Sequence, residues 1–261
     1  MPYGTPPPAR QLEHGRFNRF LATLTPHDFS LLASHLRTAP LDRGVMLHDA
    51  GEKLEHVYFP HSGMVSFVVV MQSGATVETV TIGRAGVIGA RAGLGAQSTF
   101  ARAIVQLPGT AATLSAAQFY GAASQSQGIR DLVVRYNDLL LAQIQQSVAC
   151  NALHALEARL CRWLLQTHDC MDGDVIPLTQ EFLGQMLGVR RTTVTIAARL
   201  LQSAKLIRYR RGHIQILDRK ALEDISCECY AAIRHNTDKV FPQPRLLGAA
   251  RLQASGTGAS R

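Results

Sequence analysis

The spacing of hydrophobic positions changes along the chain, and each change predicts a different kind of structure. Between about Leu41 and Leu114, short apolar and β-branched runs are separated by turns rich in glycine, proline and serine. Many short strands separated by such turns are typical of an antiparallel sandwich or barrel, and we predict a jelly roll. The expected strands are residues 57–59, 64–71, 75–82, 87–88, 100–107 and 111–114.

Helical patterns flank this region. A short helix is expected near Phe17, and a second should start after Thr25, which can cap it, with Pro26 in its first turn and Asp28 at the capping-box position. Ser115 should begin another short helix.

Residues 127–152 form the longest helical pattern, with no glycine or proline after Gly128. Two apolar stripes run along it, which predicts that one packs on the roll while the other meets a second copy of the same helix. The alternative is an ordinary core helix with one partner, and the second stripe favours the dimer. The first stripe is Ile129, Val133, Tyr136, Leu140 and Ile144, and the second is Val134, Leu141 and Val148.

A further helical run should end near His168, and residues 169–174 are a plausible hinge. Beyond it, Thr179 can cap a helix over 180–187, Gly188-Val189 turns the chain, and a second helix spans Arg190 to Ala204. Two short helices joined by a tight glycine-containing turn predict a helix-turn-helix. The expected apolar contacts are Leu183, Leu187, Val189 and Val194 in the angle, with Leu200 and Leu201 on the core side.

The segment from Leu206 to Leu217 alternates around Arg211-Gly212, which predicts a β-hairpin directly after the helix-turn-helix. A basic hairpin in this position is typical of the wing of a winged helix-turn-helix.

Charge supports this interpretation. The chain of 261 residues has a formal net charge of +8, which is compatible with a nucleic acid, an anionic membrane or an acidic ligand as partner. Residues 188–220 carry nine basic side chains and one acidic one, whereas residues 41–154 carry seven of each. The excess is therefore local to the predicted helix-turn-helix and wing, as expected for a DNA-facing surface.

The start of the second helix carries side chains suited to reading bases in the major groove, because arginine can bridge guanine O6 and N7 and threonine can contact thymine. Arginines at a helix N-terminus oppose its dipole, and an anionic partner would offset that cost. The predicted base-reading residues are Arg190, Arg191, Thr192, Thr193 and Thr195. The predicted backbone-contacting residues are Thr179, Gln180, Arg199, Lys205, Arg208, Arg210 and Arg211.

Several other classes of protein are not indicated. The chain lacks the pattern of a signal peptide or a membrane span, so a cytoplasmic protein without membrane contact is expected. The five cysteines are irregularly spaced, which predicts reduced thiols and no metal site, with a redox role for Cys161 or Cys170 left open. No local catalytic arrangement stands out, and no catalytic residue is predicted.

The order of parts resembles the Crp/Fnr family of bacterial transcription regulators over roughly residues 20–220. The stretch 47–65 is similar to the family's H-x-G-E…Y…G-x-V opening of the roll, and 178–201 is similar to its helix-turn-helix. The resemblance implies an α+β chain: an N-terminal antiparallel β-roll, a long dimerisation helix and a C-terminal winged helix-turn-helix. The implied domains are a sensor roll at 17–126, a dimerisation helix at 127–152 and a DNA-binding domain at 153–235, between flexible tails at 1–16 and 236–261.

By the same resemblance, Arg191 matches the family's base-reading arginine, Thr192 stands where many members have glutamate, and Ile196 stands where some have a second arginine. The implied partners are a palindromic double-stranded DNA operator, a second copy of the chain and RNA polymerase.

The effector pocket departs from the cyclic-nucleotide-binding members. Ala90 stands in place of the glutamate that holds the ribose, so cyclic AMP is not expected as the ligand. No cysteine precedes Cys150, which argues against an iron–sulfur cluster, and His48, His56 and His61 are interpreted as turn or surface histidines rather than haem ligands. The residues implied to line the pocket are Gly89, Ala90, Arg91, Gln97, Ser98, Thr99, Arg102, Ile144 and Gln145.

The competing hypothesis is a metal-dependent enzyme or sensor of the cupin type, which also uses a jelly roll. Such a site needs several histidines and a glutamate converging from paired strands. His56 and His61 are five residues apart, and no H-x-H motif with a downstream glutamate and histidine follows.

Overall fold

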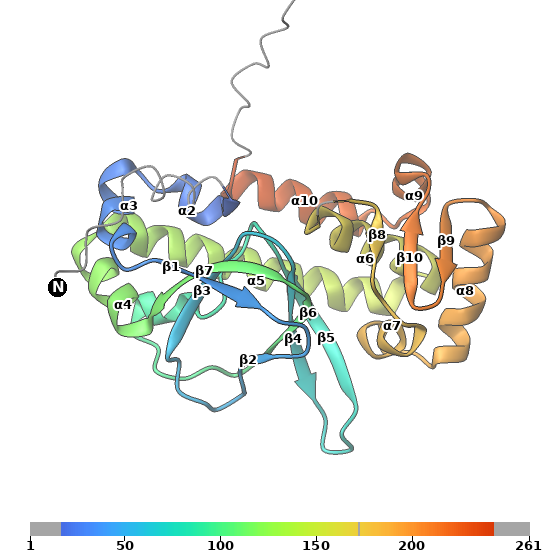
Figure 1. Cartoon of the computed structure of the whole chain (residues 1–261), viewed down its shortest axis with the longest axis horizontal. Coiled ribbons are helices and arrows are strands. Elements are labelled where there is room, and N and C mark those ends of the chain that lie inside the picture. The colour runs from blue at the N-terminus through green and yellow to red at the C-terminus, as the bar shows by residue number, and fades with distance from the viewer. Residues whose placement is uncertain (1–16, 172, 243–261) are drawn as a thin grey trace, which may run out of the picture.

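The computed structural model describes residues 17–171 and 173–242. It shows an N-terminal β-roll, a long central helix and a C-terminal helical region with a small three-stranded sheet (Figure 1). This is the predicted α+β fold. No helix among the described residues is long and apolar enough to cross a membrane.

The roll consists of two antiparallel sheets. The first has the strand order β1 (Arg37–Leu41), β7 (Gly109–Ser115), β3 (His56–Pro60), and the second has the order β2 (Met46–His48), β6 (Arg102–Leu107), β4 (Met64–Val70), β5 (Thr76–Ile82). Five of the six predicted strands are thereby confirmed. The sixth, residues 87–88, contributes only an isolated bridge between Ile88 and Tyr58, because the chain leaves the sheet at once for a short 3-10 helix, η1 (Ala90–Leu94).

The predicted helix starts are also confirmed. Helix α2 (Arg19–Thr23) is followed by α3 (Pro26–Ala33), where the Thr25 hydroxyl oxygen accepts the backbone N–H of Asp28 at 3.1 Å. Helix α4 (Ala116–Gln125) begins with a complete capping box between Ser115 and Gln118. These short helices close one end of the roll and lead into the long helix.

Helix α5 (Gln127–Leu153) is 27 residues long and runs beside the roll (Figure 1). Its first half is anchored in the roll core by Ile129, Val133 and Tyr136, all buried. The Tyr136 hydroxyl donates to the carbonyl of Val87 and accepts from its N–H, both at 2.9 Å, so the buried phenol has its partners.

The C-terminal end of the described chain differs from the prediction. Residues 236–261 were expected to be a flexible tail, but helix α10 (Cys229–Val240) continues through residue 240, and Phe241 is fully buried. The Phe241 ring lies 6.0 Å from the ring of Phe20 and 5.9 Å from that of Tyr136, centroid to centroid. The prediction was wrong here because one aromatic residue, far in sequence from its partners, docks the helix onto the roll core. Residues 1–16 and 243–261 lie outside the described residues.

The C-terminal region contains α6 (Leu156–Asp169), α7 (Gln180–Leu187), α8 (Arg191–Ser203) and α9 (Arg219–Ile225), with the hairpin β9 (Ile207–Arg210) and β10 (His213–Ile216). A two-residue strand that the sequence did not reveal, β8 (Val175–Ile176), pairs with β10. The hydrophobic core of this region continues into the roll through Met64 and Leu107.

A hydrogen bond also joins the two regions. The indole N–H of Trp163 on α6 donates to the carboxylate of Glu78 on β5 at 2.9 Å, and the Trp163 side chain is buried. The helix-turn-helix is thus packed against the second sheet of the roll.

Candidate nucleic-acid interface and cavities

The helix-turn-helix is built by local interactions that its sequence specifies. The Thr179 hydroxyl caps α7 by accepting the N–H of Phe182 at 3.2 Å. Gly188 ends α7 with a φ of +66°, a conformation that favours glycine. The next N–H, of Val189, donates to the carbonyl of Gly184 at 2.9 Å and fixes the tight turn. Leu183 and Val194 are buried in the angle between the helices, as predicted.

The N-terminal end of α8 presents exposed polar side chains. Arg191, Thr192 and Thr193 are exposed, and so is Arg190, which is the N-cap residue rather than the first helical residue. Neither arginine has a side-chain hydrogen bond or ion pair within the described part of the chain. Two cations are therefore held at the positive end of a helix dipole without a counter-ion, which favours binding of an anion there.

Thr195 differs from the other predicted base-reading residues. Its hydroxyl lies 2.7 Å from the side-chain carbonyl of Gln180 and 3.0 Å from the carbonyl of Arg191, and the side chain is only half-exposed. The structure therefore brings Thr195 and Gln180 together as a contact between α8 and α7.

The core side of α8 was predicted only in part. Leu201 is buried, but Leu200 is 54% exposed, and so is Ile196 at 58%. Leu200 is one residue, about 100°, from Leu201 on the helix, and this rotation turns Leu200 toward the exposed side. Ile196 and Leu200 instead lie four residues apart on the exposed face of α8.

The wing turn lies beside the start of α7. A Cβ placed on Gly212 would be 3.7 Å from the Thr179 methyl group, so Arg211 and the N-terminus of α7 are neighbours. Arg208, Arg210 and Arg211 are exposed, and Arg208 reaches across the hairpin to Gln215 at 3.2 Å. Arg199 and Lys205 are exposed at the far end of α8.

Two of the nine basic residues in 188–220 are not part of this surface. Arg219 pairs with Asp169 at 2.7 Å and with Glu223 at 3.1 Å, and Lys220 pairs with Asp224 at 2.6 Å. The basic surface therefore comprises Arg190, Arg191, Arg199, Lys205, Arg208, Arg210 and Arg211.

One pocket of the roll, of about 460 Å³, is lined by residues within 47–58. The pocket at the predicted effector residues is small, about 60 Å³. From helix α5 it is lined by Asn137 and Leu140, not by the expected Ile144 and Gln145. Ile144 packs on the roll core one to two turns further along the helix, and Gln145 is exposed. Of the other predicted residues, the pocket is lined by Gly89, Ala90, Arg91, Ser98 and Thr99.

The remaining two residues predicted to line the pocket, Arg102 and Gln97, do not line it. Arg102 makes two hydrogen bonds to Asp49, at 2.9 and 2.6 Å, and this pairing holds the pKa of the Asp49 carboxyl below its usual range. Gln97 does not line the pocket, and its side chain is exposed.

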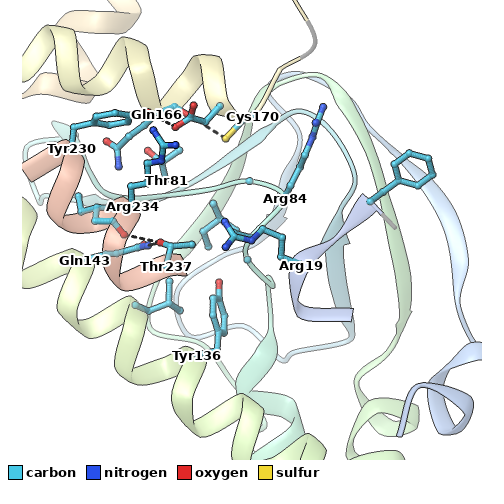
Figure 2. Close-up of a pocket in the computed structure, with 18 of the residues that line it drawn as sticks. Arg19, Thr81, Arg84, Tyr136, Gln143, Gln166, Cys170, Tyr230, Arg234 and Thr237 are labelled. Carbon is cyan, nitrogen blue, oxygen red and sulfur yellow. Dashed lines mark hydrogen bonds between the residues drawn. The ribbon is translucent and has the colours of Figure 1, made fainter. Parts of the chain in front are cut away.

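A larger cavity of about 400 Å³ lies where the roll, α5, α6 and α10 meet. Figure 2 shows Arg19, Arg84 and Arg234 around it, together with Gln143, whose amide donates to the Thr237 hydroxyl at 3.3 Å. This cavity was not predicted from the sequence, because its walls come from segments that are distant in the chain.

The cysteines fall into two groups. Burial raises the pKa of the Cys161 thiol to about 11 and that of the Cys170 thiol to about 12, so neither is a reactive thiolate at neutral pH. The other three, Cys150, Cys227 and Cys229, lie together with His154. Spacing along the chain argued against a metal site, but the ligand atoms of these four residues are within 4.8 Å of one another.

The roll histidines are not clustered in this way. The ring of His48 is buried, with Nδ1 3.1 Å from the carbonyl of Ala101, and burial lowers the pKa of its imidazole. Within residues 17–171 and 173–242, the four-residue group above is the only cluster of histidine, cysteine or acidic side chains with metal-binding geometry. The arrangement does not favour the cupin alternative.

Comparison with known proteins finds a family match for the roll and another for the C-terminal region. Residues 39–126 match the family model of the cyclic nucleotide-binding domain, and residues 158–225 match that of the Crp-like helix-turn-helix domain. Together the two matches span more than half of the chain. No curated protein sequence matches it.

Solved structures of similar fold include FixK2 from Bradyrhizobium japonicum, with a TM-score of 0.63 and 14% identity over 74% of this chain and 98% of that one. A CRP-family transcriptional regulator from Thermus thermophilus has a TM-score of 0.59 and 18% identity, over 72% and 96% of the two chains. The c-di-GMP-responsive global regulator CLP from Xanthomonas campestris has a TM-score of 0.56 and 15% identity, over 80% and 99%. At these identities the likeness shows the fold.

The turn of the helix-turn-helix yields a stability prediction. Gly188→Ala should lower the free energy of unfolding by about 1 to 2 kcal/mol, because a Cβ is disfavoured at positive φ. Gly121→Ala is the matched control: Gly121 lies inside α4 with nothing within 4 Å of an added Cβ, so that substitution should raise stability by up to about 1 kcal/mol. Urea unfolding followed by the fluorescence of Trp163 measures both, and equal effects would contradict the cap assignment.

Proposed function

Because the chain belongs to the Crp/Fnr family of transcriptional regulators, we propose that it binds a palindromic DNA operator as a homodimer, with α8 of each protomer in the major groove. The observation that carries the proposal is the exposed basic surface of α8 and the wing, where Arg190 and Arg191 have no counter-ion among the described residues. A regulator of this kind also contacts RNA polymerase, and we extend that expectation to this chain on family membership alone.

The residues divide by role. We assign base reading to Arg190, Arg191, Thr192 and Thr193, because they are exposed at the end of α8 that enters the groove in helix-turn-helix proteins. Thr195 is assigned to base reading only through its methyl group, since its hydroxyl faces Gln180. Backbone contacts are assigned to Thr179, Gln180, Arg199, Lys205, Arg208, Arg210 and Arg211, which surround α8 from the α7 N-terminus to the wing.

The dimer is supported by the second stripe of α5. Val134, Leu141 and Val148 are 45%, 55% and 66% exposed, although all three are apolar and lie on one side of the helix at a spacing of seven residues. An apolar stripe with this period packs against an identical stripe in a coiled coil. We propose that this pairing brings two α8 helices to one DNA duplex, where half-sites of helix-turn-helix dimers lie about 34 Å apart.

We propose that the roll does not bind a cyclic nucleotide in the family's usual manner. Sites for small organic ligands measure about 300–1,000 Å³, whereas the pocket at the predicted effector residues Gly89, Ala90 and Arg91 measures about 60 Å³. Ala90 supplies no carboxylate for a ribose, and the guanidinium of Arg102 is occupied by Asp49. We propose that an effector binds in the cavity of about 400 Å³ at the junction of the roll, α5, α6 and α10.

DNA binding is tested with Arg191→Ala and Arg210→Ala. Arg191→Ala should cost about 1–3 kcal/mol on the operator and relax specificity at one base position, because it removes a base contact. Arg210→Ala should weaken all DNA similarly and reduce the salt dependence, because it removes a phosphate contact. Titrations against operator and random DNA at several salt concentrations measure both.

Lys220→Ala is the matched control for these variants, since Lys220 lies in the same basic segment but is paired with Asp224 and should leave DNA affinity unchanged. An equal loss on operator and random DNA for Arg191→Ala would contradict its base-reading role. Absence of any sequence preference in the unaltered protein would contradict the proposed function itself.

The dimer is tested with Leu141→Arg, which places a charge in the middle of the apolar stripe. Leu141 occurs twice in a symmetric interface, so loss of its burial should cost about 3 kcal/mol or more and weaken the dimer at least roughly a hundredfold. Sedimentation equilibrium measures the dissociation constant. Tyr120→Arg is the control, because Tyr120 is 51% exposed on α4 and should not affect association. If both variants sediment like the unaltered protein, α5 is not the interface.

The sensor proposal is tested by thermal unfolding with cyclic AMP and cyclic GMP. A ligand that binds only the folded state raises Tm, so neither nucleotide should shift it, whereas operator DNA should. A saturable rise with either nucleotide would show that the protein binds it and would contradict this expectation.

A further inference from the structure

Three cysteines and one histidine meet where the long helix ends. Cys150 lies in the last turn of α5, and His154 is the residue that caps its C-terminus. Cys227 precedes α10, and Cys229 is the first residue of that helix. All three cysteines are buried, and the histidine is half-buried. A segment of the helix and a segment some 75 residues later thus present four potential ligands to one point.

Their separations match those of a tetrahedral metal site. The sulfur atoms of Cys150 and Cys227 are 3.5 Å apart, and the sulfur of Cys229 is 3.5 Å from Nδ1 of His154. A zinc ion with Zn–S bonds of about 2.3 Å and a Zn–N bond of about 2.0–2.1 Å holds its ligand atoms roughly 3.5–3.8 Å apart. We propose that Cys150, His154, Cys227 and Cys229 form a structural zinc site that ties the C-terminal end of α5 to the start of α10.

The groups around the cluster are those that support metal ligands. Nε2 of His154 lies 3.1 Å from the carboxylate of Glu228, which leaves Nδ1 facing the sulfurs. A carboxylate that accepts the second ring N–H of a ligating histidine fixes the tautomer and the orientation of the ring. The side-chain amide of Gln146 donates to the sulfur of Cys229 at 3.0 Å, as an N–H donor does to a metal-bound thiolate.

Charge near the cluster is complementary to the loaded site. Zinc with three thiolates and a neutral imidazole carries a net charge of −1. Arg159 and Arg162 on α6 are 9% and 7% exposed, and both interact electrostatically with the Cys150 sulfur. The buried Nε atom of each has no hydrogen-bond partner among the described residues. Buried cations need nearby negative charge. The proposed site supplies it to Arg159 and adds to that of the Glu78 carboxylate at Arg162.

A disulfide would account for fewer of the four clustered residues than a zinc site does. A bond between Cys150 and Cys227 would require their sulfurs to approach to about 2.05 Å and would leave Cys229 and His154 with no role. Four ligands of the types and number that zinc prefers, with a carboxylate behind the histidine, favour the metal. Zinc binding displaces the thiol protons, so three protons leave as three Zn–S bonds form.

The first test is the metal content of the full-length protein purified under reducing conditions. The unaltered protein should hold about one zinc per chain after equilibration with zinc and gel filtration. Replacing zinc with cobalt should give thiolate-to-cobalt charge-transfer absorption and the intense visible bands of a tetrahedral site. A protein that takes up neither metal overturns the proposal, and so does a Cys150–Cys227 disulfide that persists in the reduced, folded protein.

Variants identify the ligands. Cys229→Ser and His154→Gln should lose stoichiometric zinc, and Glu228→Gln should weaken zinc affinity about 10–100-fold because it acts through His154. Cys161→Ser is the matched control: Cys161 is also buried but lies outside the cluster, so that variant should keep its zinc. Equal zinc content in Cys229→Ser and Cys161→Ser would overturn the assignment.

A second measurement does not depend on the folding of the variants. Adding zinc to the metal-free unaltered protein should raise Tm, because zinc binds only the assembled site. The rise should also occur in Cys161→Ser, and its absence in both proteins would contradict a structural role. These measurements need no DNA, so they stand or fall independently of the proposed DNA binding.

Discussion

The rest of the structure depends on the 27-residue helix α5, which presents three different sides for packing. Its N-terminal half is buried in the roll core, where Tyr136 meets Phe20 and Phe241 and satisfies both backbone groups of Val87. Helix α10 covers a second side, held at one end by Phe241 and at the other by the cysteine cluster. A third side keeps the exposed stripe centred on Leu141. One helix therefore links the roll, the C-terminal region and the proposed second protomer.

The C-terminal region that contains the helix-turn-helix is joined to the rest of the chain in two ways, through the continuous chain and through packing on the roll. One is the α5–α6 junction at His154. The other is the face of the roll, where Trp163 donates to Glu78 and the core of the C-terminal region reaches Met64. Glu78 also accepts hydrogen bonds from Thr81 at 2.9 Å and from Ser66. Burial nevertheless raises the pKa of the Glu78 carboxyl, so keeping its charged form in place depends on these donors.

The sequence predicted the features that local rules determine. Short apolar and β-branched runs between turns predicted strands β3 to β7, and capping residues such as Thr25 and Thr179 marked helix starts correctly. Predictions of features that depend on residues distant in the sequence were wrong, or such features were not predicted at all. Phe241 is buried against the rings of Phe20 and Tyr136, which are far from it in the sequence. The cysteine cluster joins Cys150 and Cys227, which are 77 positions apart, and motif spacing does not detect such a pair. Leu200 was predicted on the core side of α8 together with Leu201, but only Leu201 is buried, because periodicity places the edge of an apolar stripe poorly at a helix end.

A rotation of the helix-turn-helix about the α5–α6 junction would leave α10 packed on α5, where Phe241 and the cysteine cluster lie at the two ends of α10. Such a rotation moves α6 away from β5 and breaks the hydrogen bond from Trp163 to Glu78. Glu78 would then be hydrated, and its charged form would become less costly. The cavity of about 400 Å³ is lined by Thr81 on β5 and by Gln166 on α6, so it changes shape in the same motion. A ligand in this cavity shifts the equilibrium between the packed and the rotated positions of the helix-turn-helix only if it binds the cavity of one position more tightly than that of the other. The packing of Trp163 on the roll, together with that of Met64 and Leu107, therefore contributes to the free energy that such a ligand must overcome.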